Sequence, residues 1–273
     1  MPVTRFAPSP TGYLHLGHAF SALFARAQAG TAGVVRLRIE DIDQPRCREI
    51  FVEAIFEDLT WLGLDWPLPV RFQSRHFDEY QQALDRLHEM GLLYPCFCTR
   101  RRISEDAAAP HGTPAIYPGT CRNLDRDLAA AKIAAGDTHA WRLDTARALA
   151  RTGPLIWRDL SLGGIAADPL RLGDVVLARK DFPASYHLAV TWDDAAEGID
   201  LVTRGADLIE ATHVHRLLQA LLNLPVPVWH HHRLILDEHG TRLAKRHQAP
   251  AIRDLRAKGM TAETVRARIG LPS

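Results

Sequence analysis

The chain has 273 residues and a net charge of +1, and 47% of its residues are hydrophobic. This length allows one or two domains with a substantial core, and the balanced charge excludes the overall basic field of a large nucleic-acid interface. The sequence contains neither a secretory h-region nor an apolar run long enough to cross a bilayer, so we expect a cytoplasmic protein.

Strands and helices alternate over residues 1–91. This alternation predicts an α/β fold with a doubly wound parallel sheet, in which active sites form at the carboxyl ends of the strands. In chain order, apolar periodicity and turn residues predict a strand at Val3–Ala7, a helix at His15–Ala29, a strand at Val34–Ile39, and helices at Arg46–Leu62 and Arg75–Met90.

Residues 92–172 interrupt this alternation with several cysteines, a loop rich in proline and glycine, and short strands, so we interpret them as an α/β insertion. Residues 173–247 are predicted to complete the domain that residues 1–91 begin, and residues 248–273 to form a short helical tail. The predicted elements are a strand of the main sheet at Asp174–Leu177, helices at Ser185–Ala196 and Asp207–Leu222, a strand at Val228–Leu236, and tail helices at Ile252–Lys258 and Ala262–Ile269.

Residues 8–18, PSPTGYLHLGH, lie at the first junction between a strand and a helix. His15 and His18 are one helical turn apart at the start of the helix, where backbone N–H groups and the helix dipole favour phosphate. Gly17 removes a side chain where a base or ribose could approach the backbone. The segment predicts a site for the phosphates of ATP. The simpler alternative is a turn rich in glycine and proline with two exposed histidines.

A P-loop is the competing motif, because the spacing from Gly12 to Gly17 fits its first part. The next two residues of a P-loop are Lys and then Ser or Thr, whereas here they are His18 and Ala19. The groups that a P-loop uses to bind phosphate and magnesium are therefore missing.

Residues 8–18 resemble the HIGH signature of class I aminoacyl-tRNA synthetases, and later segments resemble further motifs of the same family. Residues 5–9 (RFAPS), 38–43 (RIEDID) and 204–208 (RGADL) resemble the glutamyl/glutaminyl branch, and residues 242–246 (RLAKR) stand where that branch has its KMSKS loop. The matches keep the family order from residue 4 to about residue 250. The resemblance implies that residues 1–91 and 173–247 are the halves of a Rossmann-like, nucleotide-binding catalytic domain.

Full glutamyl-tRNA synthetases carry a large anticodon-binding region after that loop, whereas residues 248–273 have room for only two short helices. In this respect the chain resembles the glutamyl-Q tRNA(Asp) synthetases. The resemblance implies a ligase that activates L-glutamate with ATP, accompanied by Mg²⁺, to glutamyl-adenylate; we expect it to be a monomer, although the sequence itself leaves the oligomeric state open. The ligase then transfers glutamate to queuosine in the anticodon loop of tRNA(Asp). The alternatives are a truncated glutamyl-tRNA synthetase that charges the tRNA 3′ end and a non-catalytic tRNA-binding paralogue.

Activation of glutamate is attack of its α-carboxylate on the α-phosphorus of ATP, so positioning and charge stabilisation carry the rate. By resemblance, His15, Gly17 and His18 bind ATP, and the two histidines donate hydrogen bonds to its phosphates. Lys245 neutralises the departing pyrophosphate, although Ala244 replaces the serine that usually precedes this lysine. A solvated lysine in a hairpin is the alternative for Lys245.

A glutamate pocket needs two cationic partners and one anionic partner. By resemblance, Arg5 and Arg204 bind the carboxylates, Glu40 binds the α-ammonium, and Tyr186 caps the pocket. An arginine at the side-chain end would disfavour glutamine. The sequence leaves open which arginine holds which carboxylate, and a structural ion pair between Arg5 and Glu40 is the alternative. Further contacts are expected from Phe6, Ala7, Pro8 and Ser9.

Three of the four cysteines, Cys96, Cys98 and Cys121, cluster in the insertion. In a reducing cytosol such a group favours metal ligation over disulfides. Together with Tyr117 these cysteines resemble the zinc ligands of the family, which implies one structural Zn²⁺ per chain. On chemical grounds alone His111 would be the better fourth ligand, and free buried thiols are the alternative.

The run from Trp229 to His232 contains three consecutive histidines that could suggest a second metal site. Neighbouring side chains on a strand point to opposite faces, so only His230 and His232 share one. We therefore interpret the three histidines as strand-edge residues near the nucleotide.

Overall fold

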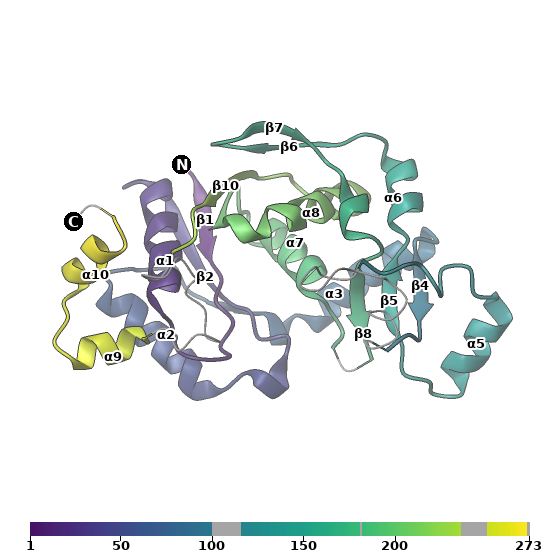
Figure 1. Cartoon of the computed structure of the whole chain (residues 1–273), viewed down its shortest axis with the longest axis horizontal. Coiled ribbons are helices and arrows are strands. Elements are labelled where there is room, and N and C mark those ends of the chain that lie inside the picture. Colours follow the sequence, from purple (N-terminus) through teal and green to yellow (C-terminus); the bar gives the residue numbers. More distant parts are fainter. Residues whose placement is uncertain (100–115, 181, 236–249, 272–273) are drawn as a thin grey trace.

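Parallel strands run through the middle of the molecule in the computed structural model, which describes residues 1–99, 116–180, 182–235 and 250–271 (Figure 1). One group of strands has the order β1-β2-β3 and a second the order β7-β6-β10-β9, and every pair in them except β6–β7 is parallel. The strands are β1 (Val3–Phe6), β2 (Val34–Ile39), β3 (Arg71–Phe72), β6 (Ile156–Asp159), β7 (Gly163–Ala166), β9 (Leu201–Gly205) and β10 (Val228–His232).

β1 and β9 join the two groups. The N–H of Val3 donates to a carboxylate oxygen of Asp200 at 2.8 Å, and the N–H of Asp200 donates to the carbonyl of Val3 at 3.1 Å. Further along, Arg5 Nη1 donates to the carbonyl of Thr203 at 2.8 Å. The order across the molecule is therefore β3-β2-β1-β9-β10-β6-β7, which confirms the predicted α/β fold built on a parallel sheet.

The helices that connect these strands agree with the predicted helices to within a few residues. The largest difference lies at α2, which begins three residues later than predicted because residues 44–46 form a separate 3₁₀ turn with Pro45 at its start. The observed helices are α1 (Leu16–Ala29), α2 (Glu49–Trp61), α3 (Phe77–Glu89), α7 (Tyr186–Ala196) and α8 (Ile209–Leu222), with further 3₁₀ turns at Gln73–Arg75, Pro169–Leu172 and Ala206–Leu208.

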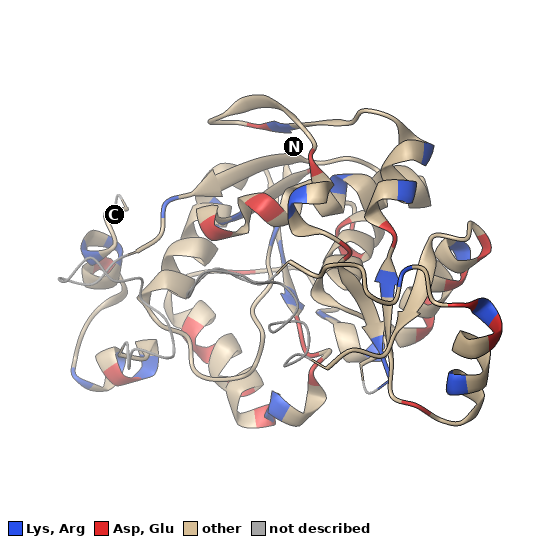
Figure 2. Ribbon diagram, turned by 45° about the vertical axis from the view of Figure 1, so that its right-hand side comes forward, with Lys and Arg blue, Asp and Glu red and all other residues tan. Residues whose placement is uncertain are grey.

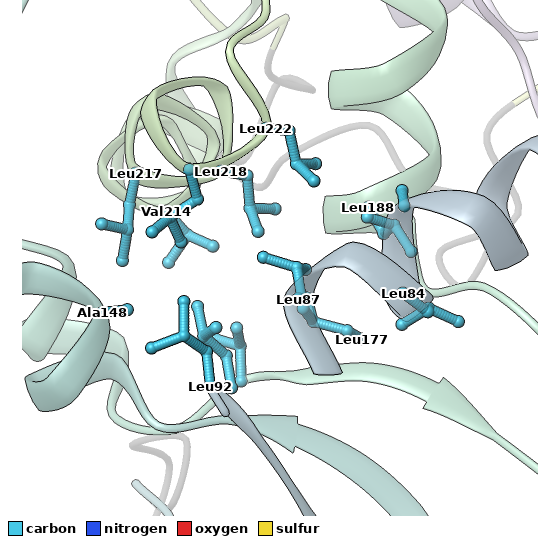
Figure 3. Packing of buried hydrophobic residues seen from close by; sticks show 14 of the residues in the cluster. Leu84, Leu87, Leu92, Ala148, Leu177, Leu188, Val214, Leu217, Leu218 and Leu222 are labelled. Atoms are coloured by element: carbon cyan, nitrogen blue, oxygen red, sulfur yellow. The ribbon is translucent and has the colours of Figure 1, made fainter. Parts of the chain in front are cut away.

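Two apolar clusters hold these helices in place. In the first, leucines on the inner face of α8 meet Leu87 of α3 together with Leu92 and Leu177 (Figure 3). In the second, Ile252 and Leu255 of the tail pack against α1 and α2. Full burial of each such side chain contributes about 2 kcal/mol. The tail helices α9 (Ile252–Ala257) and α10 (Ala262–Arg268) lie beside α1 and α2, as Figure 1 shows, and occur where they were predicted.

A smaller antiparallel sheet in the order β4-β5-β8 forms the other end of the molecule. The prediction that Asp174–Leu177 returns to the main sheet is wrong, because β8 begins at Val176 and pairs with β5. In contrast β6, inside residues 92–172, pairs with β10 of the main sheet. A short apolar run does not reveal its pairing partner, so the limits of the insertion stay a prediction. The elements here are β4 (Leu93–Cys96), α5 (Arg126–Ala134), β5 (Ala140–Leu143), α6 (Thr145–Thr152) and β8 (Val176–Arg179).

Charged residues of both signs are interspersed along the elements, as Figure 2 shows, in keeping with the net charge of +1. Within the described ranges, no helix has both the length and the apolar character needed to cross a membrane.

Candidate active site

A cavity of about 480 Å³ opens where β1, β2 and β9 end and α1 begins. It brings together all the residues predicted to bind glutamate or ATP, apart from Lys245. Lys245 and Ala244 belong to residues 236–249, which lie outside the described residues. The predicted residues that line the cavity are Arg5, Phe6, Ala7, Pro8, Ser9, His15, Gly17, His18, Glu40, Tyr186 and Arg204.

His15 and His18 cap the first turn of α1 with their own rings. The N–H of Gly17 donates to Nδ1 of His15, and the N–H of His15 donates to Nδ1 of His18, each at 3.1 Å. The two rings lie 3.8 Å apart, measured between their centroids. Because both Nδ1 atoms accept hydrogen bonds, the neutral rings carry their protons on Nε2. Both histidines can therefore donate from Nε2, which is the property that phosphate binding requires.

Arg5 is held in the cavity wall by an acidic residue from α7. Its Nε donates to Asp194 at 3.0 Å, and Asp194 also pairs with Arg38, whose side chain has no exposed surface. Burial alone would raise the pKa of Asp194, but the two arginines hold it below the ordinary value. Arg5 thus pairs with Asp194 rather than with Glu40, and it reaches the cavity already carrying one anionic partner.

Glu40 follows β2 and faces the cavity with 11% of its side chain exposed. Its nearest cation is Nη1 of Arg38, at 4.0 Å from Oε1. Burial, aided by the charges of Asp194 and Asp193, raises the pKa of Glu40 to about 7, although Arg38 and Arg5 oppose the shift. A buried carboxylate that ionises with difficulty gains most from a cation brought by a ligand, so Glu40 suits the α-ammonium of an amino acid.

Arg204, at the end of β9, is 5% exposed. Among the described residues no carboxylate pairs with it, and its hydrogen-bond partners are a tyrosine, a threonine and two histidines. Burial, together with the nearby charge of Arg5, lowers its pKa. A buried guanidinium with uncharged partners lacks a counterion, and a carboxylate in the cavity would supply one.

Cys96, Cys98 and Cys121 form a group whose sulfur atoms all lie within 4.8 Å of one another. The sulfurs of Cys98 and Cys121 are 3.6 Å apart, close to the roughly 3.8 Å expected between two thiolates on a tetrahedral zinc ion. The hydroxyl of Tyr117 lies 3.9 Å from the sulfur of Cys98 and accepts a hydrogen bond from the N–H of Cys121. Three cysteines in this arrangement indicate a zinc site. His111 lies outside the described residues.

Comparisons with known proteins agree with this geometry. The family model of the catalytic domain of class I tRNA synthetases (E and Q) matches residues 2–271. The glutamyl-Q tRNA(Asp) synthetase of Rhodobacter capsulatus is 45% identical to this chain, over 98% of this chain and 100% of its own length. The chain belongs to the glutamyl-Q tRNA(Asp) synthetase family. The glutamyl-Q tRNA(Asp) synthetase of Nitratidesulfovibrio vulgaris is 41% identical to this chain, over 96% of this chain and 83% of its own length.

The chain is also similar to glutamate–tRNA ligases, which are longer proteins. The ligase of Aquifex aeolicus is 40% identical over 96% of this chain but only 55% of its own length. A crystal structure of the glutamate tRNA ligase from Elizabethkingia meningosepticum superimposes with a TM-score of 0.71 and 26% identity. That match covers 90% of this chain and 52% of the ligase, so the chain spans about half the length of that protein.

The three histidines of β10 divide between the two faces of the strand, as the predicted alternation requires. His230 and His232 face α1, where the His232 ring meets Phe20 and Phe24 and that of His230 meets Phe24. His231 lies on the opposite face and contacts Arg204. The prediction that these histidines are strand-edge residues is wrong, because β10 lies between β6 and β9 inside the sheet, and both His231 and His232 are buried. His232 also lines the cavity.

The sequence analysis did not predict the acidic side chains that support the arginines of this site. Asp193 and Asp194 of α7, together with Glu197 directly after it, surround Arg38, and Asp194 also reaches Arg5. Their spacing places them on one face of a helix, a signal that would have predicted an acidic face but not its partners.

Proposed function

We propose that this chain is an ATP-dependent ligase that activates L-glutamate to glutamyl-adenylate and transfers it to queuosine in the anticodon loop of tRNA(Asp). One observation carries the activation step. A single cavity holds two buried arginines, one carboxylate of raised pKa and two histidines at a helix N-terminus. The acceptor follows from membership of the glutamyl-Q tRNA(Asp) synthetase family.

Charge matching supports glutamate as the amino acid. Glutamate brings two carboxylates and one ammonium, and the cavity offers Arg5, Arg204 and Glu40. Asp194 already compensates Arg5 in part, whereas Arg204 has only uncharged partners among the described residues. Glutamine has one carboxylate fewer, so it would leave one buried guanidinium of the cavity without a counterion. The cavity should therefore bind glutamine much more weakly than glutamate.

The first chemical step forms a bond between an α-carboxylate oxygen of glutamate and the α-phosphorus of ATP, and it releases pyrophosphate. His15 and His18 donate from Nε2 to the phosphate oxygens as negative charge develops there. Lys245 would neutralise the departing pyrophosphate. Mg²⁺ would enter with ATP and shield the charges of its phosphates.

In the second step a hydroxyl of queuosine attacks the carbonyl carbon of the adenylate. The new ester bond replaces the bond to AMP, and the hydroxyl proton leaves with the products. A second cavity of about 850 Å³ adjoins the first and shares Ser9, Thr11, Glu40 and Tyr186 with it. This space supports the proposal because the acceptor nucleoside must approach the same carbonyl from outside the ATP and glutamate sites.

We also propose that Tyr117 completes the zinc site. Its hydroxyl lies beside the sulfurs, and the guanidinium carbon of Arg142 stands 3.8 Å from the centre of its ring, which fixes the ring's position. A zinc ion with four protein ligands would supply structural cross-linking between β4 and the segment at residues 117–121, not chemistry.

Transfer of labelled glutamate to tRNA(Asp) with and without queuosine tests the proposed acceptor. We expect ATP-dependent labelling of the queuosine-containing tRNA only, and equal labelling when its 3′-terminal adenosine has been removed. Labelling of the 3′ end of queuosine-free tRNA(Glu) would instead establish a truncated glutamyl-tRNA synthetase. Absence of both labelling and adenylate formation, with tRNA still bound in a filter-binding assay, would instead favour a non-catalytic tRNA-binding protein.

A further inference from the structure

Arg204 is surrounded by a set of polar side chains from three separate elements. Its Nε donates to Nε2 of His231 on β10 at 3.2 Å, and its Nη1 to Nδ1 of His215 on α8 at 3.1 Å. Nη1 also lies 3.4 Å from the hydroxyl of Tyr186, and Nη2 donates to the hydroxyl of Thr212. His215 is 3% exposed and His231 is 8% exposed, so water does not compete for these bonds.

The hydrogen bonds fix the proton positions on both histidines. A guanidinium can only donate, so Nδ1 of His215 and Nε2 of His231 must be acceptors. His215 then carries its proton on Nε2, which faces Nδ1 of His187 at 3.2 Å. His231 carries its proton on Nδ1, which faces Asp159 at 2.8 Å. His187 therefore accepts the proton of His215, and Asp159 accepts that of His231, and these bonds hold both histidines in the tautomer that Arg204 requires.

All of these imidazoles are neutral near pH 7. Burial and the charge of Arg204 lower the pKa of His187 and that of His231 to about 4, although Asp159 opposes the shift at His231. The same two causes, together with the neighbouring histidines, lower the pKa of His215 well below its ordinary value. A proton added to the ring of His215 at Nδ1 would point directly at the guanidinium.

A metal ion is not the partner of these histidines. The guanidinium of Arg204 lies between His215 and His231, and its positive charge opposes a cation there. The group of potential metal ligands found among the described residues is the three-cysteine group of the smaller sheet.

We propose that His215 and His231, oriented by His187 and Asp159, are positioning residues that hold Arg204 for a carboxylate of glutamate. The two arginines of the cavity are supported in different ways. Arg5 is held by the anionic Asp194, whereas Arg204 is held by neutral acceptors. Neutral acceptors fix the plane of the guanidinium without neutralising it, so its full charge remains for the substrate. This inference rests on the proposed binding of glutamate in the same cavity.

A pair of variants at His215 separates positioning from packing. In His215→Asn the amide oxygen can replace Nδ1 as the acceptor, whereas His215→Leu removes the acceptor at similar volume. With the full chain, ATP and queuosine-containing tRNA(Asp), we expect His215→Leu to raise the KM for glutamate roughly tenfold or more, as for loss of a buried hydrogen bond to a charged group. The value of kcat should change less than about threefold, and His215→Asn should restore KM to within about threefold.

His213→Leu is the matched control. His213 is another buried histidine of α8, but its Nδ1 accepts from Trp157 and from the N–H of Asp168, away from Arg204. We expect this variant to lose stability and to keep the wild-type KM. Should His215→Leu fail to fold, the pair His231→Leu and His231→Gln makes the same comparison at Nε of Arg204.

The inference and the proposed function fail in different ways. A wild-type protein that transfers no glutamate would contradict the proposed function. An active wild type whose KM stays within about twofold in folded His215→Leu, or rises equally in His213→Leu, would overturn the role of the histidines.

Discussion

Glu40 should make the free protein less stable at alkaline pH than it would be with a neutral residue in its place. Its pKa of about 7 in the folded chain compares with an ordinary value of 4.5, mainly because the carboxyl is buried. At about 1.4 kcal/mol per pH unit, this difference corresponds to about 3 kcal/mol. The favourable contribution of the protonated carboxyl is fully present below pH 4.5 and is lost as the pH rises through 7.

Glu40→Gln keeps the shape of the protonated carboxyl and cannot ionise. We expect the free energies of unfolding of the variant and the wild type to agree at pH 4.5 and to differ by up to about 3 kcal/mol at pH 8, with the variant the more stable. The same variant should bind glutamate far more weakly, because the α-ammonium loses its anionic partner. Urea unfolding at the two pH values measures the first effect, and the KM for glutamate measures the second.

Glu53→Gln serves as the control, since Glu53 is an exposed residue of α2 and its substitution should change neither quantity. A Glu40→Gln variant that is no more stable than the wild type at pH 8 would refute the reasoning. It would mean that Arg38 and Arg5 stabilise the ionised carboxylate more than burial destabilises it.

Three further predictions concern the residue that supports the two arginines, the zinc site and Lys245. Asp194→Asn leaves two buried guanidinium groups short of an anionic partner, so urea unfolding should show a loss of about 3–5 kcal/mol; a loss below 1 kcal/mol would contradict the pairing. Cys121→Ser should reduce bound zinc, measured by metal analysis, and lower Tm; an unchanged zinc content would exclude this ligand. Lys245→Ala should slow adenylate formation roughly 100-fold to 1,000-fold in rapid-quench assays without changing glutamate affinity, and an unchanged rate would remove Lys245 from the mechanism.

The cavity residues could be predicted from the sequence because they lie at strand ends or helix starts in recognisable blocks. The HIGH-like segment fixes its own backbone through local contacts, so His15 and His18 could be placed without knowing the rest of the fold. The supporting groups could not, because His215 and Asp194 sit on helices whose sequences look ordinary. Their role depends on the packing of α7 against β1 and of α8 against β9, which is a tertiary property.

The placement of β8 failed for a related reason. A four-residue apolar strand fits either sheet equally well, and only the register with β5 decides between them. The chain also uses β6 in the main sheet although β6 lies between elements of the smaller one. No local sequence pattern shows that a strand joins a different sheet from its neighbours in the chain.

The central position of β10 has a consequence for how the protein is made. β10 lies between β9 and β6, yet the ribosome delivers it after both. Until residues 228–232 emerge, β9 and β6 each present an unpaired parallel edge, which other chains could join. Arrival of this single strand closes both edges at once and brings His231 between Asp159 and Arg204. Nascent chains stalled before this point would therefore expose aggregation-prone strand edges and lack the support for Arg204, so assembly of the sheet and of this part of the pocket should occur in the same late event.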